Sequence, residues 1–131
     1  MRKILALMIG TLALAGAPAH AERLRGEAKL AQMLEGRVAG EPVRCVNLRN
    51  VRASRVVDRT AIVYEAGSTI YVNRPQVGAE SLNQWDALVT RLHSTQLCDI
   101  DVVTLVDTAT GMYSGSVFLG EFVPYRRVRA D

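Results

Sequence analysis

The sequence has few of the residues that most often carry out chemistry. Its 131 residues include two histidines and two cysteines, and it has no glycine-rich phosphate loop, internal repeat or low-complexity tract. A zinc site usually takes four Cys, His or carboxylate ligands. One histidine is expected to be removed with a signal peptide and the two cysteines are expected to form a disulfide, so the residues that remain cannot supply such a set. We therefore expect no metal and no cofactor.

Aromatic residues are also scarce, at 5% of the chain. Most of them fall where strands are expected, which favours core positions or cross-strand pairs over a sugar-stacking platform. Trp85 lies beside a loop, and its exposure would favour a ligand-binding role. The aromatic residues are Tyr64, Tyr71, Trp85, Tyr113, Phe118, Phe122 and Tyr125.

The N-terminus has the three parts of a secretory signal. Two basic residues precede an uncharged apolar run at 4–16, and Ala19 and Ala21 form an Ala-x-Ala cleavage site. The apolar run would be about 20 Å long as a helix, and a membrane span needs about 20 residues. We predict that residues 1–21 are a cleaved signal peptide and that 22–131 form one mature domain without a transmembrane segment. No cysteine follows the run, so a bacterial lipid anchor is not expected.

Loss of the signal peptide changes the charge of the chain. The basic count falls from 16 to 14 with Arg2 and Lys3, the 13 acids remain, and the formal net charge falls from +3 to +1. This balance gives no reason to expect a nucleic-acid partner, which requires a strong basic patch. His20 leaves as well, so His93 is the only histidine of the mature chain.

Cys45 and Cys98 are the two cysteines. In an exported protein an even pair usually forms a disulfide, because the compartment is oxidising. The bridge would close a loop of about 54 residues, which the chain-entropy model values at about 4 kcal/mol of stability. Two unpaired buried thiols are the alternative.

Hydrophobic patterning predicts one helix and then strands. Residues 22–36 read as a helix that ends at Gly36. Its apolar face would contain Leu24, Ala28, Leu30, Ala31 and Leu34.

After the helix, β-branched runs at 60–65 and 68–73 flank a short turn at Ala66-Gly67 and predict a hairpin. Firm strands are also expected at 101–107 and 112–119. Residues 81–93 fit either a helix or a strand, and we favour a turn or helical piece near 81–86 followed by a strand. About six or seven short strands in all predict a mainly β fold, with a small antiparallel sheet that is barrel-like or packed as a sandwich.

Five segments together resemble a known family, at 35–45, 60–64, 71–73, 96–101 and 118–125. In this order they resemble a family of small exported proteobacterial domains of unknown function, most like its sphingomonad-type members, over about 27–129. Some relatives carry a second cysteine pair, which this chain lacks. The resemblance implies export to the bacterial envelope and a single domain, and it brings no established activity.

Asp99 and Asp101 are a candidate acidic pair. They would project from the same side of an extended segment, where two carboxylates can divide acid and base roles or hold a cation. The alternative is that they flank the start of a strand, solvated or bonded to a turn. A thiol enzyme using His93 would lose its nucleophile to the disulfide. Ser114 misses the Gly-x-Ser-x-Gly spacing of a serine hydrolase by one residue.

Arginine is the most unusual feature of the mature chain, in which Lys29 is the only lysine. The planar guanidinium fork suits phosphate and carboxylate groups. If two clusters of arginines meet in the fold, they would form an anion-binding face for lipid phosphate, lipopolysaccharide or an acidic protein. The alternative is that codon usage favours arginine and that nearby acids pair with it. The clusters are Arg49, Arg52 and Arg55, within a stretch that also holds Arg44 and Arg59, and Arg126, Arg127 and Arg129.

These observations favour a periplasmic or secreted protein of a bacterium. The leading hypothesis is a non-catalytic binding or structural module of the cell envelope, which a coherent arginine or aromatic patch would support. One alternative is a small periplasmic hydrolase, which a hollow gathering Asp99, Asp101 and His93 would support. The other is an inhibitor or accessory subunit of a larger envelope protein, which an exposed apolar patch would support.

Overall fold

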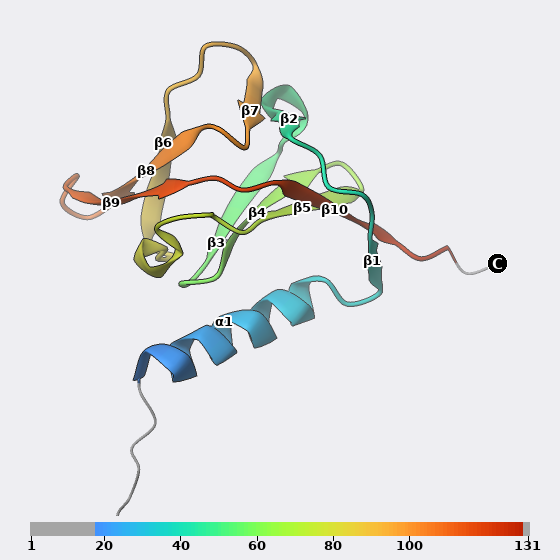
Figure 1. The fold of residues 1–131 in the computed structure, drawn as a ribbon, viewed down its shortest axis with the longest axis horizontal. Coiled ribbons are helices and arrows are strands. Elements are labelled where there is room, and N and C mark those ends of the chain that lie inside the picture. Colours follow the sequence, from blue (N-terminus) through green and yellow to red (C-terminus); the bar gives the residue numbers. More distant parts are fainter. Residues whose placement is uncertain (1–17, 130–131) are drawn as a thin grey trace, which may run out of the picture.

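The structure is a computed structural model that describes residues 18–129. Figure 1 shows the helix below one sheet and a second group of strands above that sheet. The elements are α1 (Pro18–Met33), β1 (Arg37–Ala39), β2 (Cys45–Asn47), the 3₁₀ turn η1 (Leu48–Asn50), β3 (Ala53–Val57), β4 (Ala61–Ala66), β5 (Thr69–Asn73), the 3₁₀ turn η2 (Ala79–Ser81), β6 (Asp86–Thr90), β7 (Gln96–Cys98), β8 (Val102–Asp107), β9 (Tyr113–Phe118) and β10 (Phe122–Arg127).

The strands form three antiparallel sheets, so the predicted mainly β fold with an N-terminal helix is confirmed. The sheets have the orders β1-β10-β5-β4-β3, β2-β7 and β6-β8-β9. The expected six or seven strands were too few: residues 18–129 contain ten, of which β1, β2 and β7 are only three residues long. A closed barrel is also wrong, because β3 and β6 are the edges of different sheets and do not pair.

The predicted hairpin at 60–73 is present as β4 and β5. Ala66 pairs with Thr69, which leaves Gly67 and Ser68 as a two-residue loop. Gly67 has a φ of 61°, and a positive φ at the first loop position is the requirement of a type II′ turn, where glycine is favoured.

The ambiguous segment 81–93 contains a strand. The 3₁₀ turn η2 ends at Ser81, earlier than the expected helical piece, and β6 then runs over Asp86–Thr90 beside β8. The prediction of a turn near 81–86 followed by a strand is therefore confirmed, because a turn at residues 84–85 directly precedes β6.

Strand β4 is buried on both faces, because the five-stranded sheet lies between two hydrophobic clusters. Side chains alternate along a strand, so Ile62 and Tyr64 face one cluster and Ala61 and Val63 face the other. The first cluster joins this sheet to the other two sheets, as in a sandwich. The second joins it to α1 through Leu30.

The main core contains a buried tyrosine. The ring of Tyr64 packs against the ring of Phe122, with 5.8 Å between their centroids. Burial disfavours the charged phenolate and raises the pKa of Tyr64 above its ordinary value. Tyr64 is therefore a packing residue of the core and not a proton donor at neutral pH.

Helix α1 begins earlier than predicted and uses a different face. It runs from Pro18 to Met33, and its buried residues are Gly26 and Leu30. Leu24, by contrast, is 58% exposed, and Ala28 and Ala31 are exposed too, so the predicted face was wrong at these positions. A Cβ on Gly26 would lie 2.8 Å from the carbonyl oxygen of Asp58, so the helix packs against the β3–β4 turn at a distance that only glycine allows.

Most of the predicted signal peptide, residues 1–17, lies outside the described residues. The expected cleavage point after Ala21 falls in the first turn of α1. Between residues 18 and 129, no helix has the length and apolar character needed to cross a membrane.

Candidate functional site

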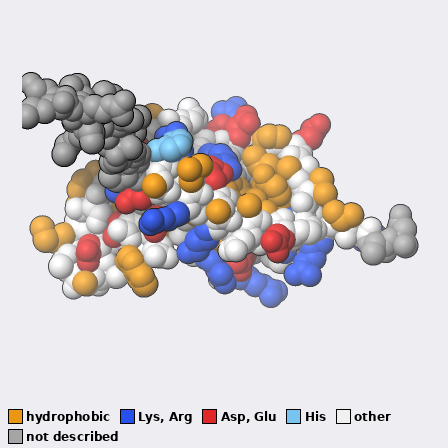
Figure 2. Space-filling view, turned by 90° about the horizontal axis from the view of Figure 1, so that it is seen from below, with side chains coloured by type: hydrophobic (Ala, Val, Ile, Leu, Met, Phe, Trp, Pro, Cys, Tyr) orange, Lys and Arg blue, Asp and Glu red, His pale blue; other side chains and the backbone are white. Residues whose placement is uncertain are grey.

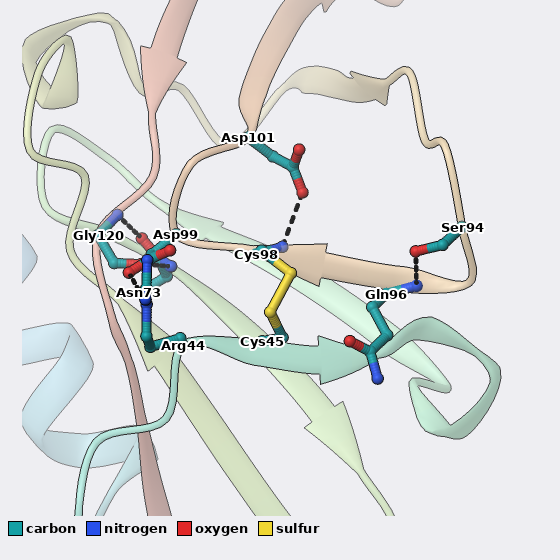
Figure 3. Close-up of a disulfide and its surroundings, with 9 residues drawn as sticks. All are labelled: Arg44, Cys45, Asn73, Ser94, Gln96, Cys98, Asp99, Asp101 and Gly120. Atoms are coloured by element: carbon teal, nitrogen blue, oxygen red, sulfur yellow. Dashed lines mark hydrogen bonds and ion pairs between the residues drawn. A yellow bond between two sulfur atoms is a disulfide. The ribbon is translucent and has the colours of Figure 1, made fainter.

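The predicted disulfide is confirmed. Cys45 and Cys98 lie opposite each other in the β2–β7 pair and are bonded through their sulfur atoms. Figure 3 shows the bridge joining the two short strands side by side. Because η1 directly follows β2, the bridge also holds the segment that contains Arg49.

The two carboxylates of the predicted acidic pair do not share a site. Asp99 accepts a hydrogen bond from Nε of Arg44 at 3.1 Å, and its side chain is mostly buried. Asp101 instead accepts the backbone N–H of Cys98 at 2.7 Å. In Figure 3 the two side chains lie on different sides of the turn after β7. Each carboxylate stabilises local structure, as the alternative reading of this segment expected.

His93 lines a shallow hollow with Asp101 but not with Asp99. The hollow has a volume of about 430 Å³ and also contains Arg91 and Ile100. Asp101 already accepts the Cys98 N–H, and no hydrogen bond joins it to His93 within residues 18–129. The three groups that a carboxylate hydrolase would need are therefore not gathered together. Nor does any group of three His, Cys, Asp or Glu side chains in the described part of the chain have the arrangement of a metal site.

A hollow of about 370 Å³ lies between α1, the β3–β4 turn and η2. We call it the helix-side hollow. Its charged lining residues are three cations and three acids, and one of these cations, Arg59, is paired with Glu22 at 2.7 Å. Its charge is therefore balanced within the fold. The six charged residues are Glu22, Arg25, Lys29, Asp58, Arg59 and Glu80.

A second hollow of about 420 Å³ lies beside the β4–β5 turn, and we call it the arginine pocket. It contains Arg49 and Arg52 and no carboxylate. Asn50 and Tyr71 add an amide and a phenol, which supply further hydrogen-bonding groups. Its full lining is Val46, Asn47, Arg49, Asn50, Arg52, Ala66, Gly67 and Tyr71.

Local structure fixes the position of Arg49. The side-chain oxygen of Asn47 accepts the backbone N–H of Arg49 at 3.0 Å, which caps the 3₁₀ turn η1. The backbone N–H of Arg52 donates to the carbonyl of Glu65 at 2.8 Å and ties the next residues to β4. The two arginines thus stand on a segment held by a side-chain cap, a sheet bond and the disulfide.

The second arginine cluster reaches the same end of the five-stranded sheet. Because neighbouring strands are antiparallel, β3 begins where β4 ends, and β10 ends where β5 begins. Arg126 and Arg127 close β10, and Arg37 lies directly opposite Arg127 on β1. We call Arg37, Arg49, Arg52, Arg126 and Arg127 the arginine end. Figure 2 shows several Lys and Arg side chains along the lower rim of the molecule, and others at its centre and upper edge.

The two clusters flank the β4–β5 turn and do not merge. Two strands separate β3 from β10, and strands lie 4.7–4.9 Å apart, so the axes of β3 and β10 are about 14 Å apart. Side chains alternate, so Arg127 and Arg37 lie on the helix-side face with Tyr125, whereas Arg52 lies on the other face. The terminal nitrogen of Arg126 lies near Gly40, which is on the β1 side of the sheet. The arginines would therefore form two subsites on opposite faces of the sheet, which approach each other at the β4–β5 turn, where Gly67 lines the pocket and Arg37 contacts Ser68.

The six arginines that were predicted to form an anion-binding face differ in whether they make ion pairs. Arg55 pairs with Glu65 at 3.4 Å on the helix side of the sheet. Within the described range 18–129, the other five make no ion pair. These are Arg49, Arg52, Arg126, Arg127 and Arg129. The expectation that acids pair with the arginines thus holds for Arg55 among these six, and also for Arg44 and Arg59 in the same stretch of the sequence.

Several aromatic and apolar residues are exposed. Trp85 is 73% exposed, as anticipated for a loop position. Tyr113 and Phe118 are exposed at 68% and 50%, and they form cross-strand pairs with Val106 and Val102, which is the second of the two expected arrangements. They lie on the outer face of the β6-β8-β9 sheet together with Val89 and Val102, because the inner face holds the core residues of β8.

Sequence reasoning missed Arg37. It stands alone in the sequence, and only the pairing of β1 with β10 places it beside Arg127. Its guanidinium donates to the carbonyl oxygens of Ser68 at 2.8 Å and of Tyr125 at 3.2 Å. No local sequence signal marks a contact between residues this far apart.

Comparison of the chain with protein-family models, curated proteins and solved structures found no match. The resemblance to small exported proteobacterial domains therefore stays a prediction.

Proposed function

We propose that the protein is an exported, non-catalytic module of the bacterial cell envelope that binds an anionic component through the arginine pocket. The observation that carries this proposal is a hollow of about 420 Å³ with two arginines and no carboxylate. Guanidinium groups bind phosphate and carboxylate through paired hydrogen bonds. The helix-side hollow, which has a similar size, offers no comparable excess of charge.

The location in the envelope rests on the secretory pattern and is supported by the disulfide. Bridges such as Cys45–Cys98 persist mainly in oxidising compartments. The intact mass of the protein recovered from a native cell tests this part. We expect the mass of residues 22–131 less two hydrogens, with no thiol open to alkylation. A mass that retains 1–21 would overturn the cleavage, and two alkylated thiols would overturn the bridge.

Anion binding is tested by titration with inorganic phosphate, followed by NMR of backbone amides. We expect weak, saturable shifts at Asn50 and Gly67, which line the pocket. The double variant Arg49→Ala, Arg52→Ala should lose them. A matched control, Arg23→Ala with Arg91→Ala, removes the same charge from exposed positions elsewhere and should keep them. Equal shifts in the two double variants would overturn the proposal.

A second candidate function, an accessory subunit of a larger envelope protein, is favoured by the apolar outer face of the β6-β8-β9 sheet. Phe118, Val89 and Val102 are each at least 40% exposed there. If this face binds the larger protein, Phe118→Asp should shift the protein from a large to a small complex in an envelope extract. The arginine double variant should leave that complex intact. The opposite result would assign the partner to the arginine pocket.

A further inference from the structure

We propose that the arginine end binds one chain of phosphate groups, which passes around the exposed β4–β5 turn from the arginine pocket on one face of the sheet to Arg37 and Arg127 on the other. This inference rests on the proposed function and names the class of its ligand. A chain of this kind is a linear polyanion, such as inorganic polyphosphate.

The first observation is a pair of like charges at the second subsite. Arg37 on β1 lies directly opposite Arg127 on β10. Like charges at directly opposed positions of an antiparallel pair are destabilising. No ion pair with an acid compensates either arginine within residues 18–129. An anion bound between them would remove the repulsion, so the arrangement favours an anionic ligand.

The second observation is that the Arg37 guanidinium is already in place. It is held by the carbonyl oxygens of Ser68 and Tyr125, at 2.8 and 3.2 Å. Two such bonds use part of its five N–H donors and leave the rest for a ligand. A side chain that is fixed beforehand loses little conformational entropy on binding.

The third observation is continuity between the subsites. Gly67 lines the arginine pocket, and the next residue, Ser68, is the one that Arg37 contacts. Both turn residues are exposed, and a Cβ built on Gly67 would meet no atom within 4 Å. The turn is therefore an open crossing point between two cationic sites.

The placement of the sites on two faces of the sheet favours an extended ligand. A chain that passes around the turn can contact both sites and gains effective concentration at the second. A nucleic-acid strand would also need aromatic platforms for its bases. Tyr71 is the only aromatic side chain that lines the pocket, and it is half-buried. The geometry thus favours a phosphate chain over a single strand of nucleic acid.

The test compares long-chain inorganic polyphosphate with orthophosphate, using fluorescence anisotropy for the chain and NMR for the monomer. Bivalent contact typically raises affinity by about 10²–10⁴ over one site. We expect Arg37→Ala with Arg127→Ala to weaken chain binding at least about tenfold, while orthophosphate shifts at Gly67 remain. Arg49→Ala with Arg52→Ala should abolish both. The control Arg23→Ala with Arg91→Ala should change chain binding less than about threefold.

Two further variants test whether weaker chain binding comes from the lost contacts and not from misfolding of the protein. Arg127→Gln keeps Arg37 and its backbone contacts, and it should still weaken chain binding. Ser68→Asp places a negative charge on the exposed crossing point and should weaken the chain but not orthophosphate. If either pair of arginines behaves like the control, the chain does not cross the turn and the inference is overturned.

A failure of this inference and a failure of the proposed function would give different experimental results. Orthophosphate binding at Gly67 without a gain for the chain would overturn the inference and leave the proposed function standing. If the unmodified protein binds neither orthophosphate nor the phosphate chain, both this inference and the proposed function are overturned. Equal affinity for polyglutamate of matched charge, or for single-stranded DNA, would overturn the phosphate class and identify an acidic peptide or a nucleic acid as the ligand.

Discussion

Two hollows of similar volume, about 370 and 420 Å³, use charge in opposite ways. In the helix-side hollow, cations and acids are equal in number, and Arg59 is bonded to Glu22. In the arginine pocket, Arg49 and Arg52 have no acid beside them. Charges in the helix-side hollow are balanced by ion pairing between α1 and the sheets. The arginines of the arginine pocket have no acidic neighbour in their lining and can bind a ligand. Counting arginines along the sequence cannot separate these two uses.

The ion pairs of the helix side confirm this division. Arg74 forms two bonds with the carboxylate of Glu27, at 2.5 and 3.0 Å, and joins the loop after β5 to α1. The hydrogen bonding of the Arg74 guanidinium to the Glu27 carboxylate is the main reason that the pKa of Arg74 is raised. Both side chains are about half exposed, so such a pair contributes about 0–1 kcal/mol. These pairs orient the helix more than they stabilise it.

The largest effect on the arginine side should come from its disulfide. Replacing Cys45 and Cys98 by alanine opens a loop with a sequence separation of 53, and the chain-entropy model predicts a loss of about 4 kcal/mol in the free energy of unfolding. Urea denaturation measures it. Amide exchange should increase first at η1 and the arginine pocket, and much less in α1. Asp99→Asn, which removes only the Arg44 pair, is the control and should cost about 1 kcal/mol or less. An equal increase of amide exchange in α1 would contradict this difference between the helix side and the arginine side.

A smaller effect is expected on the helix side from Gly26→Ala. Alanine normally stabilises a helix relative to glycine by about 1 kcal/mol. Here the new Cβ would meet the Asp58 carbonyl oxygen and the Thr60 hydroxyl, so we expect a loss of about 1–3 kcal/mol, as for overpacking. Thermal unfolding monitored by circular dichroism gives the sign. Ala28→Gly, at an exposed helical position, should cost about 1 kcal/mol. A more stable Gly26→Ala protein would show that the helix does not pack closely on the turn.

The smallest effect should come from Arg127→Glu. It replaces a like-charge pair with an opposite-charge pair across β1 and β10, which should stabilise the free protein by about 0.2–1 kcal/mol. Salt screens exposed charges, so the gain should shrink at high ionic strength. Urea denaturation at two salt concentrations tests this. Arg129→Glu, beyond the end of β10, should give a smaller gain. An unchanged stability at low salt would mean that Arg37 and Arg127 do not repel each other.

Local patterns in the sequence were sufficient for the larger elements. The turn at Gly67 and its flanking β-branched runs predicted the β4–β5 hairpin, and the run at 101–107 predicted β8. Cysteine count and export predicted the bridge. Strands of three residues, such as β1 and β7, are too short to show a period of two, so their existence depends on pairing with distant segments.

The candidate site was harder to predict than the fold. Arg52 and Arg55 are three residues apart on or beside one strand, and side chains alternate, so they lie on opposite faces of the sheet. One lines the arginine pocket and the other pairs with Glu65. Asp99 and Asp101 have the two-residue spacing that predicts a shared side, but a turn at residues 99–100 breaks the alternation. Spacing is informative only where the backbone stays extended.

The unclosed seam between β3 and β6 has a consequence for the behaviour of the protein at high concentration. Edge strands with free backbone N–H and C=O groups are templates for aggregation by edge-to-edge pairing. Here the seam is lined by Lys29 and Arg55 on one side and Asp86 on the other. Charged side chains at an edge oppose the addition of a foreign strand. Lys29, Arg55 and Asp86 therefore oppose edge-to-edge pairing at this open side of the sandwich.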